Sequence, residues 1–453
     1  MQKTSDFDEL IRFSYEKGYF SGAWLYKRNG KIVSRGAVGV LDPATQEPVR
    51  TDSLFEIASI TKQFTASAIM LLRDKGLLKL DDPLEKYIPK IAYPGICVRN
   101  LLNHTSGLPD YVDWIKKKVA KDGGFPKNAD LEQMLTCGQL PRQFAPNEHW
   151  AYCNTGFCVL ALIVEKASGM PFADFLRQHL FLPSGMVRTS VFHPYKDKYI
   201  PENFARGCIL ENGRYVLVEQ SEKEGYTAFL EGIEGDGSVK TSVDELLLWD
   251  ETLRRETVLP LSTQQEMFSV TTYGGGAQYP YGYGWQVYRN AKIGTWVSHT
   301  GRWAGYNGIF ARALEQDSMV ALLCNQYGCD ILARMQLLDG VESMLAEGQA
   351  QLPRTLDETY PSPVPGDVRR SLCGDYCSDG LPIQGLFGSH ISITDEDGTL
   401  KVRLTFMDEQ YDSQILSTGD DGYIARDGLF ELKIKNGALT TSMYGIDFVY
   451  HKS

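Results

Sequence analysis

A serine and a lysine three residues apart, Ser59 and Lys62, are the first candidates for chemistry in this sequence. They open a run from Ser59 to Lys75 that is apolar almost all round and that Gly76 would end, which predicts a buried helix. Residues three apart share a helix face, so the lysine would lie beside the serine hydroxyl. A desolvated lysine loses proton affinity and can take a serine proton, so the pair indicates nucleophilic catalysis.

The Ser-x-x-Lys spacing alone is weak, because Ser14 and Lys17 repeat it on a segment typical of an exposed amphipathic helix. Ser59 differs because its helix is buried, and a lysine there needs a reason. The sequence contains no Gly-x-Ser-x-Gly motif, no His-Glu-x-x-His pair and no Gly-x-x-x-x-Gly-Lys phosphate loop. The case for chemistry therefore rests on Ser59 first.

Tyr152 and Asn154 form the second candidate group. In an extended segment, residues i and i+2 point the same way, so both side chains could face one cleft just before a helix predicted at Gly156–Ser168. A tyrosine near a lysine can relay protons, and an asparagine can hold a substrate carbonyl. The alternative is structural, since Asn154 could simply cap that helix.

His299, Thr300, Gly301 and Arg302 form the third group, at the end of a predicted strand. Gly301 would let a substrate backbone approach the strand edge. The backbone N–H of Arg302 could join that of Ser59 as an oxyanion-binding pair. A single histidine beside a strand is also compatible with a purely structural role.

Two further features near these motifs are open to two interpretations. Lys240 begins a Lys-Thr-Ser sequence that lacks the glycine of the third group, and a capping box before a helix explains it better. Tyr111, Trp114, Trp150 and Trp303 lie near the motifs in sequence and could line an aromatic cleft, although core packing explains at least some of them.

The elements that must position these residues come from both ends of the first 350 residues. Strand patterns occur at Ser21–Lys27 and Lys31–Val38, and again at Thr295–His299, Asn307–Ala313 and Met319–Cys324. Helical patterns fill most of the chain between them. We therefore expect an α+β fold, in which an antiparallel sheet takes strands from both ends and is flanked by helices, with a helical subdomain inserted.

The C-terminal part has a different pattern. Pro353, Pro361, Pro363 and Pro365 mark a linker at residues 353–366, after a catalytic domain at residues 1–352. Short alternating segments separated by turn signals follow, at His390–Thr394, Thr399–Thr405, Gly422–Ala425, Leu429–Ile434, Leu439–Met443 and Phe448–His451. Residues 367–453 are therefore expected to form a small all-β domain, a sandwich or a barrel.

The ordered set Ser-x-x-Lys, Tyr-x-Asn and His-Thr-Gly resembles the class C β-lactamase and D,D-peptidase family of penicillin-recognising serine hydrolases. The segments Phe55–Lys62, Leu101–Leu108 and Tyr281–Trp285 carry the resemblance further, and it covers about residues 5–350. The C-terminal β domain is similar to the lipocalin-like barrels attached to D-aminopeptidases. At Pro146-Asn147 the chain departs from the Pro-Gly that the family usually has.

The resemblance implies a site between the sheet and the helical subdomain. Ser59 would be the acylated nucleophile, Lys62 its base or proton relay, and Tyr152 the partner in deacylation. Asn154 and His299 would orient the substrate, with Thr300, Gly301 and Arg302 beside them. Whether Lys62 or Tyr152 is the general base stays open. The segment Asn103–Gly107 is prominent in the family but is expected to be structural.

Composition limits the partners and the cellular compartment that we expect for this protein. The formal net charge of −11 disfavours nucleic-acid binding, and no stretch approaches the roughly 18 consecutive apolar residues of a membrane helix. The first ten residues contain acids where a signal peptide has its apolar core, and the nine cysteines are scattered, so we expect a cytoplasmic protein with reduced thiols. The expected partner is a small-molecule or short-peptide substrate, with no cofactor and no metal.

The sequence therefore predicts a serine hydrolase that acts through an acyl-enzyme, most simply an intracellular peptidase of D-amino-acid type or an esterase. β-Lactamases of this kind usually carry lysine where this chain has His299, and histidine, with an unperturbed pKa of about 6.5, is mostly neutral above pH 7. We expect weak turnover of anionic β-lactams and better rates on neutral or amine-bearing substrates. A true β-lactamase and a non-catalytic scaffold of the same fold are the alternatives.

Overall fold

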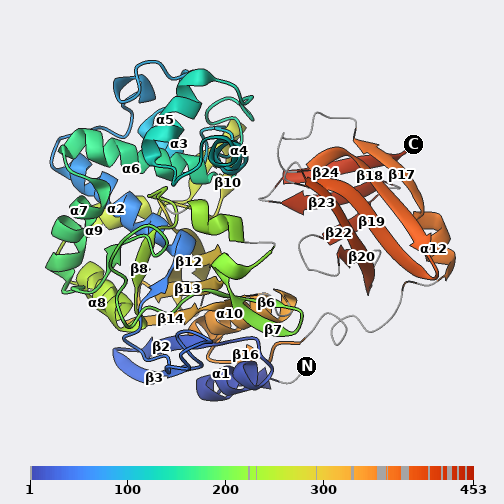
Figure 1. Cartoon of the computed structure of the whole chain (residues 1–453), viewed down its shortest axis with the longest axis horizontal. Helices are drawn as coiled ribbons and strands as arrows, with labels where there is room; N and C mark the ends of the chain where they lie inside the picture. Colours follow the sequence, from blue (N-terminus) through green and yellow to red (C-terminus); the bar gives the residue numbers. More distant parts are fainter. Residues whose placement is uncertain are drawn as a thin grey trace.

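The computed structural model describes residues 3–222, 225–230, 232–291, 293–327, 331–354, 364, 366–378, 387–406, 409–419, 422–425, 431–435, 438–443 and 446–453. Two units are present in this part of the chain, a sheet with its helices and a closed barrel (Figure 1). Most of the predicted linker, residues 353–366, lies outside the described residues.

The first unit is built on a six-stranded antiparallel sheet of order β11-β12-β13-β14-β2-β3. Its strands are β2 (Gly22–Arg28), β3 (Lys31–Val38), β11 (Gln286–Asn290), β12 (Gly294–Trp303), β13 (Tyr306–Ala313) and β14 (Ser318–Cys324). Strand β14 pairs with β2, so that Met319 lies opposite Lys27 and Cys324 opposite Gly22. The prediction of one sheet with strands from both ends of the domain is confirmed.

Helices cover both faces of this sheet. On one face, Val320 and Leu322 of β14 pack in a cluster with α1 (Phe7–Glu16) and α10 (Ile331–Glu347). The alternate residues of β14, Ala321 and Leu323, join the larger core on the other face. Because side chains alternate along a strand, two apolar faces require cover on both sides.

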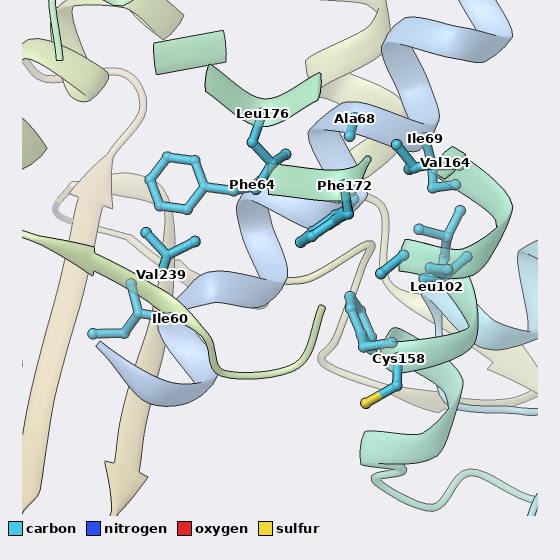
Figure 2. Packing of buried hydrophobic residues seen from close by; sticks show 14 of the residues in the cluster. Ile60, Phe64, Ala68, Ile69, Leu102, Cys158, Val164, Phe172, Leu176 and Val239 are labelled. Carbon is cyan, nitrogen blue, oxygen red and sulfur yellow. The ribbon is translucent and has the colours of Figure 1, made fainter. Parts of the chain in front are cut away.

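The larger core joins the sheet to the helical subdomain. The helices on this side are α2 (Lys62–Asp74), α3 (Val98–Leu102), α4 (Val112–Asp122), α5 (Asn128–Cys137), α6 (Asn154–Ser168), α7 (Phe172–Leu176), α8 (Val243–Arg254) and α9 (Leu261–Met267). Figure 2 shows side chains of α2, among them Phe64 and Ile69, beside those of α3, α6 and α7. Helix α2 therefore has apolar contacts on nearly every side, as its sequence predicts.

Two helix boundaries differ from the predicted ones. Ser59 lies in a separate 3₁₀ turn, η1 (Ala58–Thr61), and the α-helix begins only at Lys62. Helix α6 starts at Asn154, two residues before the predicted Gly156, and ends as predicted at Gly169, which is left-handed with φ 71°.

Short elements complete the first unit. A small sheet of order β4-β8-β5 joins β4 (Phe55–Glu56), β8 (Val239–Thr241) and β5 (Ser190–Val191). Others are β1 (Lys3–Thr4), β6 (Cys208–Glu211), β7 (Arg214–Leu217), β9 (Thr271–Tyr273), β10 (Ala277–Tyr279), β15 (Gln326–Tyr327) and β16 (Ala350–Gln351).

The C-terminal unit is a closed barrel, which decides between the two predicted β architectures. Helix α12 (Gly366–Leu372) precedes its strands β17 (Gly374–Ser378), β18 (Phe387–Glu396), β19 (Thr399–Phe406), β20 (Glu409–Gly419), β21 (Gly422–Ala425), β22 (Glu431–Lys435), β23 (Ala438–Met443) and β24 (Ile446–Lys452). Pairing of β17 with β24 closes the barrel. Six of these strands match predicted segments, whereas β17 and β20 were not predicted.

Within the described residues, no single helix has the length and apolar composition needed to cross a membrane. Helix α6 and the segment Phe172–Ser184 meet the requirement only when taken together, and the chain bends by 77° between them.

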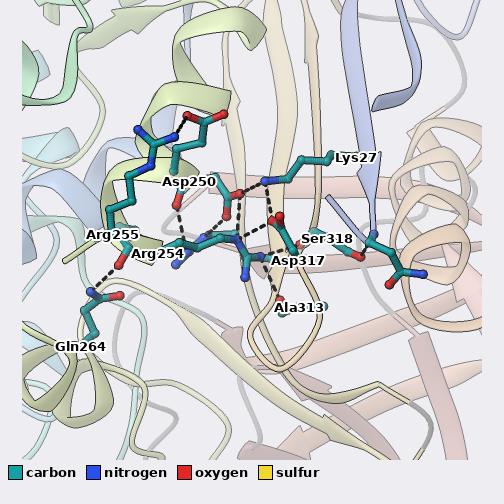
Figure 3. A network of polar contacts seen from close by, with 12 residues as sticks. Lys27, Asp250, Arg254, Arg255, Gln264, Ala313, Asp317 and Ser318 are labelled. Atoms are coloured by element: carbon teal, nitrogen blue, oxygen red, sulfur yellow. Dashed lines mark hydrogen bonds and ion pairs between the residues drawn. The ribbon is translucent and has the colours of Figure 1, made fainter. Parts of the chain in front are cut away.

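A buried ion network fixes α8 to the sheet (Figure 3). The carboxylate of Asp250 accepts hydrogen bonds from Arg312 Nε at 2.6 Å, Lys27 Nζ at 2.7 Å and Arg254 Nε at 3.0 Å. Burial alone would raise the pKa of Asp250, but the three cations lower it to about 2. A charge this deeply buried is stable only because it is fully compensated.

Removing this carboxylate should destabilise the sheet domain strongly. Asp250→Ala leaves Arg312, which is 2% exposed, without its counter-ion, and such a loss costs about 3–5 kcal/mol. All seven tryptophans precede residue 304, so tryptophan fluorescence in a urea titration reports this domain alone. The control Asp122→Ala breaks an exposed pair with Lys118 and should leave the free energy of unfolding nearly unchanged. Equal small losses in both variants would contradict the assignment.

Candidate active site

The turn that carries Ser59 is held by the small sheet. Val239 of β8 accepts a hydrogen bond from Ile57 N at 3.1 Å and donates one to Thr61 Oγ1 at 3.1 Å. Between these two contacts Ala58 has a φ of 45°, which is unfavourable for a residue with a Cβ. The contacts with β8 therefore keep a strained turn in place and present Ser59, which is partly exposed, at the surface of the site.

Lys62 is fully buried and has three hydrogen-bond partners. Its Nζ lies 3.0 Å from Ser59 Oγ, 2.9 Å from Asn154 Oδ1 and 3.0 Å from the backbone oxygen of Asp236. The rings of Tyr152 and Phe157 lie 4.9 Å and 5.5 Å from the same nitrogen. The predicted pairing of Ser59 with Lys62 is present, and it includes Asn154.

The environment of Lys62 favours its neutral form. Burial lowers the pKa of Lys62 from 10.5 to about 8, although the negative charge of Asp236 opposes the shift. A neutral amine keeps two N–H groups and one lone pair. Carbonyl oxygens can only accept, so Asn154 Oδ1 and the Asp236 oxygen would take the two N–H groups. The lone pair would then be directed at the hydroxyl of Ser59.

Tyr152 lies on the other side of the serine. Burial raises the pKa of Tyr152, and a hydrogen bond with Ser59 acts in the opposite direction. The phenol is therefore protonated at neutral pH and can pass a proton on, but a phenolate is disfavoured. Asn154 does not cap α6 with its side chain, because its oxygen accepts from Lys62. The expectation that Tyr152 and Asn154 face the same site agrees with this geometry.

The segment Asn103–Gly107 positions Tyr152 through its backbone. His104 accepts hydrogen bonds from Ala151 N at its oxygen and from Cys153 N at its Nδ1, both at 3.0 Å. The His104 ring is 1% exposed and packs on the Tyr152 ring with centroids 4.5 Å apart. These contacts clamp the residues on either side of Tyr152, which supports the structural role expected for Asn103–Gly107.

The departure at Pro146-Asn147 leaves this arrangement intact. Asn147 has a φ of 64°, a conformation that asparagine adopts more readily than other residues with a side chain. Its N–H donates to the Thr105 oxygen at 2.9 Å, and its Oδ1 accepts from Asn100 Nδ2 at 2.8 Å. Asparagine therefore takes the left-handed position that glycine usually fills, and adds a side-chain bond to the clamp.

His299 is neutral, as predicted, but its ring nitrogens bind protein groups. Nδ1 lies 2.6 Å from the Thr300 oxygen, which can only accept, so Nδ1 carries the proton. Nε2 therefore accepts from the Tyr281 hydroxyl at 2.9 Å. Burial, together with the charge of Lys62, lowers the pKa of His299 to about 3. With its ring 6.2 Å from that of Tyr152, His299 supports the tyrosine and does not line the pocket beside Ser59.

Gly301 is required by a contact that the sequence did not predict. A Cβ at this position would lie 2.1 Å from the Ile57 oxygen and 3.3 Å from Ile60 Cγ1. The missing side chain therefore lets β12 approach the turn that carries Ser59. Beyond Ser298, where its pairing with β11 ends, β12 continues as an edge strand to Arg302.

A pocket of about 140 Å³ opens beside Ser59. Of the predicted site residues, Asn154 and Arg302 also line it. Of the four aromatic residues singled out in the sequence, Tyr111 and Trp303 are on its wall. Trp150 instead stacks on Tyr279 at 3.5 Å, and Trp114 packs against the core, as the alternative interpretation holds.

Three charged residues of the pocket wall escaped prediction: Glu56, Asp236 and Lys240. Lys240 is fully buried, lies opposite Glu56 in the β4–β8 pairing and forms an ion pair with it at 3.4 Å. The Lys240 sequence was interpreted as part of a capping box, and Ser242 does cap α8 through Glu245 N. No local signal singles out Lys240, because most of its neighbours in sequence, Gly237, Ser238, Thr241 and Ser242, are small or polar.

Comparison with known proteins agrees with this geometry. The sequence model described as Beta-lactamase matches residues 7–338. Penicillin-binding protein 4* of Bacillus subtilis (strain 168) is 36% identical over 318 residues, which are 69% of this chain and 69% of that protein. The D-aminopeptidase of Brucella ovis is 28% identical over 269 residues, 58% of this chain and 48% of that protein, so the match spans about half of that relative.

Solved structures extend the likeness to the whole chain. The octameric penicillin-binding protein homologue from Pyrococcus abyssi covers 98% of both chains with a TM-score of 0.64 and 22% identity. D-amino acid amidase from Ochrobactrum anthropi SV3, complexed with L-phenylalanine amide, covers 71% of this chain and 90% of its own, with a TM-score of 0.57 and 23% identity. At these identities the likeness establishes the fold alone.

The reactivity of Ser59 should follow the protonation of Lys62. Below pH 8 the rate of Ser59 modification by a fluorophosphonate probe should rise roughly tenfold per pH unit, and it should level off above pH 8, because only neutral Lys62 accepts the proton. In Asp236→Asn, the loss of a negative charge near Lys62 should move the midpoint to lower pH. A rate that stays constant from pH 6 to 9 would exclude Lys62 as the base.

Proposed function

Because the chain belongs to the Beta-lactamase family, we propose that it is a serine hydrolase that cleaves amide or ester bonds of D-amino-acid-type substrates through an acyl-enzyme on Ser59. The similarity to a D-aminopeptidase and the shared fold with a D-amino acid amidase support this substrate class. The observation that carries the proposal is the contact of Lys62 Nζ with Ser59 Oγ at 3.0 Å, on a lysine whose two other partners are acceptors only.

Acylation would proceed as follows. Neutral Lys62 takes the hydroxyl proton of Ser59 while Ser59 Oγ attacks the substrate carbonyl carbon. The backbone N–H groups of Ser59 and Arg302 are the proposed donors to the oxyanion that forms. When the tetrahedral intermediate collapses, the bond to the leaving amine or alcohol breaks, and the proton returns from Lys62 to that group, with Tyr152 as the relay.

Deacylation would use the same groups with water in place of the hydroxyl. Lys62 accepts a proton from a water molecule through the Tyr152 hydroxyl, the resulting hydroxide attacks the acyl carbon, and Ser59 Oγ leaves with that proton. Of the two candidate bases, Lys62 has the pKa nearer to neutrality, about 8, whereas burial moves that of Tyr152 away from it. We therefore propose Lys62 as the base and Tyr152 as the hydroxyl that relays protons.

A β-lactamase is the second candidate, and the position of Arg302 favours it. Neutral His299 provides no positive charge for the carboxylate of a β-lactam, but the guanidinium of Arg302 is always charged and lies on the pocket wall. Comparing kcat/KM for nitrocefin with that for a neutral aminoacyl ester separates the two functions. Equal efficiency on both would make β-lactam hydrolysis the leading function.

Loss of either catalytic group should abolish hydrolysis without unfolding the protein. We expect Ser59→Ala and Lys62→Ala each to lower kcat by about 10³-fold or more on aminoacyl esters and amides. The chain provides a matched control in Lys17→Ala, which alters the second Ser-x-x-Lys sequence at an exposed lysine directly after the end of α1. This variant should keep full activity. If Ser59→Ala hydrolysed the substrates as fast as the wild type, the mechanism would be refuted. If the wild type itself hydrolysed none of them, the result would favour a non-catalytic scaffold.

A further inference from the structure

Two carboxylates are among the described residues that line the Ser59 pocket, those of Glu56 and Asp236. The charge of Asp236 is the one that loses its nearby cation when Lys62 becomes neutral. Asp236 lies between Gly235, where a Cβ would be 2.4 Å from the Phe157 oxygen, and Gly237, where it would be 3.6 Å from Ala58 Cα. Gly235 is required for the close approach of this loop to α6, and Gly237 lies in ordinary contact with the turn that carries Ser59. The loop thereby places Asp236 on the same pocket wall as Ser59.

The backbone and the side chain of Asp236 have different hydrogen-bond partners among the described contacts. The backbone oxygen accepts from Lys62 Nζ, whereas Oδ2 accepts from the Tyr111 hydroxyl at 3.1 Å. Tyr111 also lines the pocket and is a neutral donor. Lys62 supplies a nearby positive charge only while it is protonated, and it must be neutral to activate Ser59. In the reactive state the Asp236 carboxylate therefore favours another cation.

The charges of the other charged residues on the pocket wall do not depend on Lys62 for compensation. Glu56 already has a cation, because Lys240 lies 3.4 Å away and both side chains are almost completely buried. Arg302 is exposed, so solvent screens its charge. Leu230, Ile233 and Trp303 add apolar surface to the wall. A carboxylate with a neutral donor, next to apolar surface, matches an ammonium group next to an apolar side chain.

We infer that Asp236 binds the free α-ammonium group of an aminoacyl substrate and makes the Ser59 pocket selective for acyl groups that carry this charge. The inference rests on the proposed acyl-enzyme function and adds the residue that selects the acyl group. Acyl groups of the same shape without the amine would leave the carboxylate without a cation in the reactive state and would react more slowly.

The test compares esters whose acyl group carries the amine with one whose acyl group lacks it. The methyl esters of phenylalanine, as both enantiomers, and of 3-phenylpropionic acid share the aromatic side chain and the leaving group. The wild type should prefer the better phenylalanine ester in kcat/KM by on the order of 10- to 100-fold. Asp236→Asn should remove most of this preference. The substitution also changes the pKa of Lys62, but that change affects the hydrolysis of all these esters and cancels in the ratio of their kcat/KM values.

Asp110→Asn is the matched control. Asp110 is a nearby carboxyl whose pKa burial raises to about 6, and its Oδ1 accepts from Val112 N at 2.8 Å, a bond that asparagine keeps. It does not belong to the pocket wall as described, so this variant should retain the wild-type substrate ratio. An unchanged ratio in Asp236→Asn, with Ser59-dependent hydrolysis present, would overturn the role of Asp236. Absence of Ser59-dependent hydrolysis on every ester would instead overturn the proposed function.

Discussion

The site depends on the burial of a single ammonium group, that of Lys62. Removing a lysine from water costs several kcal/mol when it stays charged, and the protein reduces that cost by lowering its proton affinity. The amide of Asn154 and the backbone of Asp236 provide two acceptors that fit either protonation state, and Ser59 provides a third partner that fits both. A group held in this way can gain and lose a proton without reorganisation of its surroundings, which is what a base for serine requires.

Each nearby element limits the movement of one of these partners. Strand β8 holds the strained turn at Ala58, and the absence of a side chain at Gly301 lets β12 pack against that turn. His104 holds the backbone on both sides of Tyr152, so the tyrosine and Asn154 keep a fixed distance from Lys62. Most of these contacts involve backbone atoms. A family can therefore change side chains at the pocket wall and retain the catalytic geometry.

The sequence was sufficient for the fold class, for the sheet that takes strands from both ends, and for the grouping of Lys62 with Ser59 and Asn154. Local patterns predict these because buried elements have a periodic apolar pattern, and because a lysine in an almost entirely apolar helix requires a polar partner. The sequence missed the three charged residues of the pocket wall, Glu56, Asp236 and Lys240. It was insufficient for β20, because this strand begins with mostly polar residues and has few β-branched ones. It was also insufficient for the structural roles of His299 and Gly301. Those roles depend on partners distant in sequence, Tyr281 and Ile57, and no local pattern identifies them.

Two aspartates of the same domain show how the surroundings decide what a carboxylate does. Asp250 is fully buried and receives hydrogen bonds from three cations, so its charge is compensated by the protein and has no capacity left for a ligand. Asp236 is only partly buried, and its carboxylate receives a hydrogen bond from a neutral hydroxyl beside the reactive serine. The fixed cations around Asp250 stabilise the fold. The charge of Asp236 is compensated only while Lys62 is protonated, so a substrate cation can neutralise it when Lys62 is neutral. The number of fixed cations around a carboxylate, more than its burial, thus distinguishes a structural position from one that can select a substrate.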